Sequence, residues 1–166
     1  VDITSIWGSG GINFFGKTYT QLFVNINGNL TFESGLSTFT PETIGTGFSS
    51  PIIAAFWADV DTRAIPSTAI PTAGGNSLGS NNVYYDLDAN NGVFTATWDD
   101  VGYYNRHNNK LNAFQIQLVK VGDNGDFDII YRYETINWTT GDASSGVDGL
   151  GGKPARVGYT AGNGVG

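Results

Sequence analysis

The residues best suited to chemistry lie in the segment 56–63, FWADVDTR, which follows the apolar run 52–55. Residues two positions apart in an extended chain share a face, so Asp59 and Asp61 would point the same way where the strand leaves the core. Two adjacent carboxylates repel each other, and their charge has to be neutralised. Three partners are open: the Arg63 side chain, backbone N–H groups, or a bound cation.

Calcium is the one cofactor that we keep as a candidate, since Ca²⁺ takes about 6–8 oxygen ligands, several of them from carboxylates. The predicted metal ligands are Asp59, Asp61, Asp86 and Asp88. Further carboxylates occur at positions 99–100 and within 123–128, but none of these groups has EF-hand spacing. Clusters of Asp, Asn and Gly are also ordinary turn chemistry, so calcium binding stays open.

No catalytic residue is predicted. His107 is the single histidine, and its polar neighbours place it on a solvated loop. The chain has no G-x-S-x-G turn to present a nucleophile, and it has too few His and no Cys to form a zinc site. Paired-carboxylate hydrolysis of glycosides is the one enzymatic reading that survives.

The composition favours an all-β domain and excludes several partner classes. Aromatic residues make up 13% of the 166 residues and glycines number 24, whereas only 14% are charged. The net charge of −7 argues against nucleic acid and anionic membrane surfaces, because both are bound through basic patches. Without cysteine there are no disulfides, and no apolar run is long enough to span a membrane. We expect a single domain over residues 1–166, excised from a longer secreted protein.

Alternating apolar and polar residues predict three hairpins. Asn27-Gly28 turns the first, within 19–32, and two further Gly-containing turns at 90–92 and 122–125 join the others. The run 52–57 predicts a strand buried on both faces. A helical turn is expected at 40–43, and loops are expected at 64–81, 103–110 and 141–153. We therefore predict an all-β, mostly antiparallel β-sandwich of about eight strands, with long loops and at most one short helix. The predicted core contains Phe56, Trp57, Trp98, Phe114, Ile116 and Ile129.

The chain resembles the NIDO (nidogen-like) domain, an extracellular module of nidogen, alpha-tectorin and some mucins. The resemblance covers about residues 14–164 and is carried most specifically by VNINGN, FWADVDT and WTTGDAS. It implies a secreted, non-enzymatic module of adhesion or matrix proteins at the cell surface. A cysteine-free version rich in Gly and Asn resembles the members found in bacterial surface proteins. Because no short motif defines the family's ligand site, the resemblance assigns no site residue.

The leading hypothesis is an extracellular adhesion or matrix module that binds an extracellular protein or glycan through loops, or assembles into a multimer or fibre through edge strands. The alternative is a carbohydrate-binding module, because exposed aromatic rings can stack on sugars. A glycoside hydrolase is a distant third. The candidate binding-surface residues are Tyr84, Tyr103, Tyr104, Arg106, His107, Trp138 and Asp142.

Overall fold

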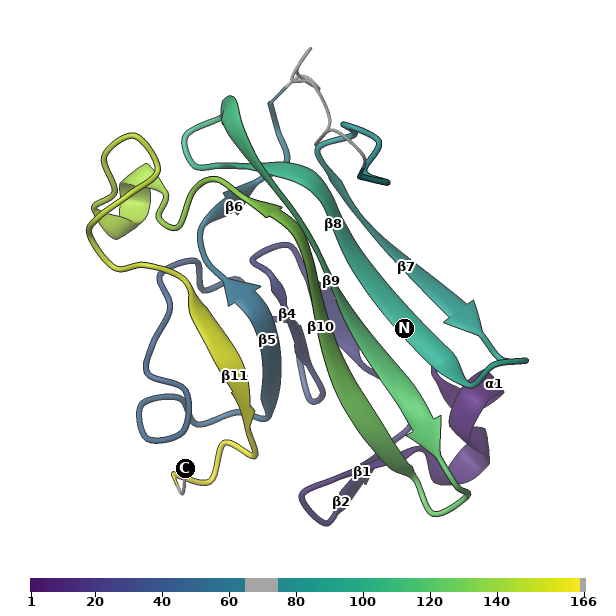
Figure 1. Cartoon of the computed structure of the whole chain (residues 1–166). Helices are drawn as coiled ribbons and strands as arrows, with labels where there is room; N and C mark the ends of the chain where they lie inside the picture. Colours follow the sequence, from purple (N-terminus) through teal and green to yellow (C-terminus); the bar gives the residue numbers. More distant parts are fainter. Residues whose placement is uncertain (65–74, 165–166) are drawn as a thin grey trace.

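The structure is a computed structural model that describes residues 1–64 and 75–164. In these residues, two antiparallel sheets pack face to face as a β-sandwich (Figure 1). The all-β prediction is confirmed. Eleven strands occur in the described residues, more than the eight or so expected, because short strands such as β1 and β6 carry too few residues to show a period.

The five-stranded sheet follows the order β10-β9-β8-β6, with β7 also paired to β8. Its strands are β6 (Val60–Asp61), β7 (Asn82–Asp88), β8 (Val93–Tyr103), β9 (His107–Val121) and β10 (Asp126–Ile136). The second and third predicted hairpins are β7–β8 and β9–β10. The expected loop 103–110 is wrong, because β8 ends at Tyr103 and β9 already begins at His107.

The four-stranded sheet follows the order β11-β5-β4-β3. Its strands are β3 (Phe23–Asn25), β4 (Asn29–Thr31), β5 (Ile52–Trp57) and β11 (Arg156–Thr160). Gly28 makes the predicted Asn-Gly turn between β3 and β4 with a φ of 81°, and a Cβ there would lie 1.9 Å from the Phe56 carbonyl oxygen. Glycine is required at this position on both counts.

Shorter elements complete the chain. The first residues form α1 (Thr4–Trp7) and a 3₁₀ turn (Gly8–Gly10), and these lead into the ribbon of β1 (Ile12–Phe14) and β2 (Lys17–Tyr19). A second 3₁₀ turn, η2 (Asp142–Ser144), lies in the segment before β11. The helical turn expected at 40–43 is absent there, since residue 40 is a bend, residues 41–43 have no regular structure, and a turn follows only at 44–47. No helix in the described ranges is long and apolar enough to cross a membrane.

The main core lies between the two sheets. Phe56, Trp98, Phe114 and Ile116 are buried in it as predicted, whereas Ile129 is only partly buried because β10 is an edge strand. All six residues of β5 are buried, as the apolar run predicted. Its second face packs against Phe48, Leu36 and Ile44 from the segment that precedes it, which forms a smaller cluster around Trp57.

Two buried carboxylates on β8 hold the loop that leads into β7. Asp99 accepts hydrogen bonds from the backbone N–H groups of Leu78 (2.8 Å) and Ser80 (3.0 Å), and Asp100 accepts one from Gly79 (2.7 Å). These carboxylates therefore have a structural role. The rest of the predicted 64–81 loop, residues 65–74, lies outside the described residues.

Candidate functional site

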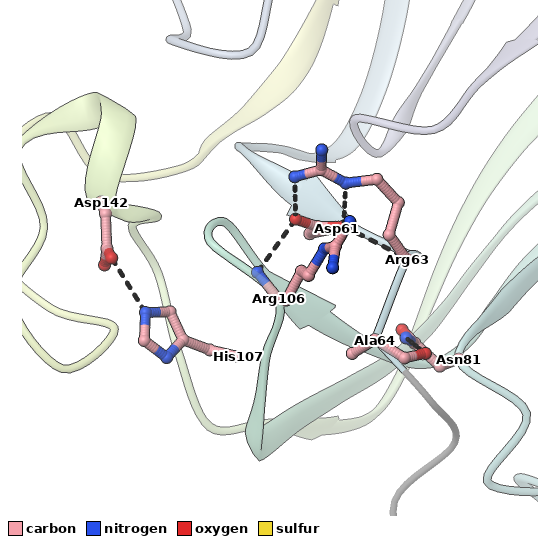
Figure 2. A network of polar contacts seen from close by, with 7 residues as sticks. All are labelled: Asp61, Arg63, Ala64, Asn81, Arg106, His107 and Asp142. Atoms are coloured by element: carbon pink, nitrogen blue, oxygen red, sulfur yellow. Dashed lines mark hydrogen bonds and ion pairs between the residues drawn. The ribbon is translucent and has the colours of Figure 1, made fainter.

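Asp61, the last residue of β6, holds the Arg63 side chain in a fixed position at one end of the sandwich (Figure 2). Its Oδ1 accepts from Arg63 Nε (2.8 Å) and its Oδ2 from Nη2 (2.5 Å), while the backbone N–H of Arg106 donates to Oδ2 at 3.0 Å. Burial alone would raise the pKa of Asp61, but the hydrogen bonds from Arg63 and Arg106 outweigh it and bring the pKa to about 2. Asp61 is therefore ionised under all ordinary conditions.

Asp59 lies nearby in a different environment. Its side chain is buried, and its Oδ2 has no hydrogen-bond partner within the described residues. Burial, followed by the charge of Asp61, raises the pKa of Asp59 to about 6. The two carboxylates thus differ: Asp61 is neutralised by Arg63, and Asp59 is protonated over part of the physiological pH range.

The segment around η2 packs directly on Asp59. A Cβ on Gly141 would lie 2.7 Å from Asp59 Oδ2, so the carboxylate is in contact with the backbone there. The backbone N–H of Asp142 donates to the Tyr104 carbonyl at 2.8 Å, and Asp142 Oδ2 lies 2.8 Å from His107 Nε2. Figure 2 shows the His107–Asp142 pair beside the Asp61–Arg63–Arg106 network, so the turn after β8 joins the two.

A hollow of about 590 Å³ opens beside this network. The Arg63 guanidinium lies over the Tyr104 ring, 5.4 Å from its centroid, and both residues line the hollow. Its apolar wall includes Ile26 and Phe39, two large side chains that are exposed. We call the exposed or half-exposed side chains here the loop-end surface: Phe39, Arg63, Tyr104, Arg106, His107 and Asp142.

The predicted metal ligands do not form one group. Asp61 lies opposite Gly102 on β8, whereas Asp86 lies opposite Thr95 toward the other end of that strand. Both oxygens of Asp61 already accept from Arg63, and Asp88 accepts from Asn91. Among residues 1–64 and 75–164 there is no group of three or more His, Cys, Asp or Glu side chains arranged to hold a metal ion. Calcium binding stays a prediction that this geometry does not support.

Some predicted binding-surface residues gather at this site and others do not. Tyr104, Arg106, His107 and Asp142 come together on the loop-end surface, while Tyr84 is exposed on β7. The prediction that Tyr103 and Trp138 are surface residues is wrong, because both are buried. Their rings pack on each other with centroids 5.4 Å apart, and Trp138 Nε1 donates to the Val101 carbonyl at 3.0 Å. This aromatic pair is part of the core.

Sequence reasoning did not assign Phe39 and Ile26 to the site. Ile26 is an apolar residue in the turn between β3 and β4, where polar residues are usual, and this was the available signal. Phe39 lies in a polar segment and gave a similar signal. Both side chains are large, apolar and exposed next to a hollow.

Comparison with known proteins places the chain among extracellular modules. The family model described as "Nidogen-like domain" matches residues 20–166. Alpha-tectorin is 34% identical over 163 residues in mouse and 33% in human, covering 90% of this chain, and nidogen of Drosophila melanogaster is 30% identical over 164 residues, covering 92%. The chain spans 7% of the length of these alpha-tectorins and 12% of that nidogen. No solved structure matches. These relatives are animal proteins, so they give no support to the bacterial-type assignment.

Proposed function

Because the chain belongs to the nidogen-like domain family, whose members are extracellular domains, we propose that it is a non-enzymatic matrix module that binds a partner through the loop-end surface. The observation that carries the proposal is the fixed Arg63 beside exposed aromatic and apolar side chains at a hollow. Arg, Tyr and Phe are enriched at the energetic centres of protein interfaces.

Immobilisation makes Arg63 a suitable contact residue. Asp61 fixes the guanidinium through Nε and Nη2, and the described residues provide no hydrogen bond to Nη1. A side chain that is already ordered loses less entropy when a partner binds, since each mobile side chain costs about 0.5–1.5 kcal/mol to immobilise. The rigid sheets thus present a preformed surface.

The experiment measures binding of the purified chain to immobilised extracellular-matrix extract. Phe39→Ala removes an exposed ring and Tyr104→Ala a half-exposed ring from the loop-end surface, and neither breaks a buried ion pair. Phe15→Ala is the matched control, because Phe15 is a 62% exposed phenylalanine in the β1–β2 turn, whereas Phe39 is 44% exposed. We expect the first two variants to lose binding and the control to keep it. Unchanged binding by folded Phe39→Ala and Tyr104→Ala chains contradicts the proposal.

A carbohydrate-binding module is the second candidate, and the exposure of Tyr84 and the position of Tyr104 favour it. A glycan array that shows binding to a neutral sugar, weakened by Tyr104→Ala, would make this the better description. The glycoside hydrolase reading has one argument in its favour, the divergent pKa values of Asp59 and Asp61. Both carboxylates line the hollow but are almost fully buried, and both oxygens of Asp61 already accept from Arg63, so we expect no turnover of polysaccharides.

A further inference from the structure

A polar hollow lies on the outer face of the five-stranded sheet, which is the face turned away from the core. Trp98 of β8 and Phe114 of β9 face the core, so their neighbours Thr97 and Gln115 face outward. Thr97 and Gln115 lie opposite each other, and Arg132 of β10 lies opposite Gln115. The hollow that these residues line has a volume of about 390 Å³, within the range of roughly 300–1,000 Å³ that is usual for small-ligand sites. We call it the sheet-face hollow.

One wall of the sheet-face hollow is a loop that two carboxylates hold in place. Glu134 of β10 accepts hydrogen bonds from the backbone N–H groups of Asn76 (2.8 Å) and Ser77 (3.2 Å), and Asp99 of β8 holds the residues that follow, as described above. The hydrogen bonds from Asn76 and Ser77 keep the pKa of Glu134 below its usual range. The wall is therefore preformed, and the loop already uses oxygens of both carboxylates.

Several polar groups in the hollow have no partner among the described residues. Arg132 forms no hydrogen bond or ion pair within that part of the chain, and Ser77 Oγ is buried there without a hydrogen-bond partner. Gln115 Nε2 donates to Thr97 Oγ1 at 2.9 Å, which fixes the amide and leaves its Oε1 and one N–H available. Because a buried polar atom without a partner costs free energy, these groups favour a ligand that supplies hydrogen bonds.

The charges around the hollow favour an uncharged ligand. Arg132 is the one cation among the described lining residues, whereas Glu134 and Asp99 are two carboxylates, so an anion would be repelled on balance. A cation would find both carboxylates already bonded to the N–H groups of the loop. A sugar hydroxyl both donates and accepts hydrogen bonds, so the hydroxyls of one ring can satisfy Arg132, Ser77 Oγ and Gln115 Oε1 together.

An aromatic ring lies on the same face of the sheet, at the other end of this row of residues. Tyr84 of β7 is 46% exposed and lies opposite Thr97. From Thr97 the row continues through Gln115 to Arg132. Neighbouring strands lie about 4.8 Å apart, so Tyr84 and Arg132 are about 14 Å apart across the sheet. This span exceeds one sugar ring, and the apolar face of a further ring can stack on Tyr84.

We propose that the sheet-face hollow binds an uncharged oligosaccharide. One ring occupies the hollow and forms hydrogen bonds with Arg132 and Gln115, and the following rings cross the strands over Thr97 and stack on Tyr84. The site shares no residue with the loop-end surface, so this inference does not depend on what that surface binds.

The experiment titrates the isotope-labelled chain with hexasaccharides and follows the side-chain amide of Gln115 by NMR. Cellohexaose, maltohexaose, mannohexaose and chitohexaose are the neutral probes, and a heparin hexasaccharide is the acidic one. We expect at least one neutral probe to shift the Gln115 amide. Arg132→Ala should weaken its binding about tenfold, the loss expected for one hydrogen bond to a charged group. Arg156→Ala, which removes an exposed arginine on β11 of the other sheet, is the matched control and should leave binding unchanged.

The length of the probe tests whether the ligand crosses the strands. Tyr84→Ala should weaken binding of the active hexasaccharide but not of the corresponding disaccharide, because the shorter ligand does not reach from the hollow to the ring. The proposal is overturned if no neutral probe shifts Gln115 at millimolar concentration, if the heparin hexasaccharide binds more tightly than every neutral probe, or if Arg132→Ala binds as the wild type does. Loss of binding in Tyr104→Ala would place the sugar on the loop-end surface and would also contradict it.

Discussion

At the scale of single residues, two neighbouring carboxylates with the same side chain have opposite roles. Asp61 is stabilised as an anion by Arg63, whereas Asp59 is buried without an equivalent partner, and the pKa of Asp59 is raised to about 6. The sequence predicted that these charges must be neutralised and named Arg63 as one candidate. The sequence could not show which of the two carboxylates pairs with Arg63, because the bend between β5 and β6 decides which one faces the guanidinium.

The first prediction concerns the pH dependence of Asp59. A carboxyl whose pKa rises from 3.8 to about 6 on folding binds its proton more tightly in the folded state, so the free energy of unfolding falls as pH rises through this range. Asp59→Asn removes this pH dependence. The free energy of unfolding of the variant, relative to that of the wild type, should therefore be about 1–3 kcal/mol higher at a pH above 6 than at pH 3.8. Denaturant unfolding of both proteins at each pH measures the difference. A pH-independent difference would show that Asp59 titrates normally.

The second prediction concerns calcium. Because Arg63 occupies both oxygens of Asp61 and Asp59 Oδ2 lies against Gly141, we expect the thermal midpoint to be the same in calcium and in EDTA. Differential scanning calorimetry of the same sample under the two conditions measures this. A higher midpoint in calcium would restore the metal site, and Asp59→Asn would then show whether Asp59 is a ligand.

At the scale of elements, two contacts hold the site in place: the η2 segment packs on Asp59, and Trp98 joins the two sheets. Trp98 stacks on Phe114 with centroids 5.0 Å apart, and its Nε1 donates to the Ile26 carbonyl at 2.8 Å. Ile26 lies in the turn between β3 and β4, so this bond ties a wall of the hollow to the opposite sheet.

The third prediction concerns the fit at Gly141. Its φ of −81° suits any residue, so Gly141→Ala acts only by steric contact with the Asp59 carboxylate. We expect a loss of about 1–3 kcal/mol in the free energy of unfolding, the usual range for overpacking. Gly10→Ala is the control, because a Cβ there meets no atom within 4 Å. Equal stability of the two variants would mean that the η2 segment moves away from Asp59 without cost.

The fourth prediction concerns the sheet packing. Trp98→Ala should lower the free energy of unfolding by about 3–5 kcal/mol, since it opens a cavity in the core and removes the bond to Ile26. Trp98→Phe should cost less, because it keeps most of the ring contact with Phe114. Denaturant melts of both variants measure the difference. A loss below about 1 kcal/mol for the alanine variant would contradict the packing described for Trp98.

At the scale of the whole molecule, the alternating pattern of residues predicted the two packed sheets and most of the core. The Asn-Gly turn and the buried run of β5 each corresponded to a strong local signal. The site was predicted in part: Tyr104, Arg106, His107 and Asp142 were named, but they come together only because the η2 segment folds back on the turn after β8. Such long-range contact has no sequence period. The same limit explains Tyr103 and Trp138, whose polar surroundings in the sequence concealed their burial.

The fifth prediction concerns assembly through edge strands. β10 and β11 are edge strands, and Val157 and Tyr159 on β11 are exposed, an arrangement that favours pairing with another chain. We expect concentration-dependent self-association in sedimentation velocity, and Val157→Lys should suppress it. Lys17→Ala, on the β1–β2 ribbon, is the control. If the chain is monomeric at every concentration, the prediction of self-assembly is wrong, and the module can bind only other kinds of molecule.

The pairing of both chain ends with the four-stranded sheet has a mechanical consequence. Val1–Ile3 pair beside the strand that leads into β3, and β11 pairs with β5 at the opposite edge of the same sheet. Tension applied between the ends is therefore carried first by these two peripheral pairings and across that sheet, while the five-stranded sheet, which supplies Asp61, His107 and the turn after β8, lies outside the direct line of force. We expect these outer strands to yield first under load, while Asp61, His107 and the turn after β8 keep their geometry until the strands detach.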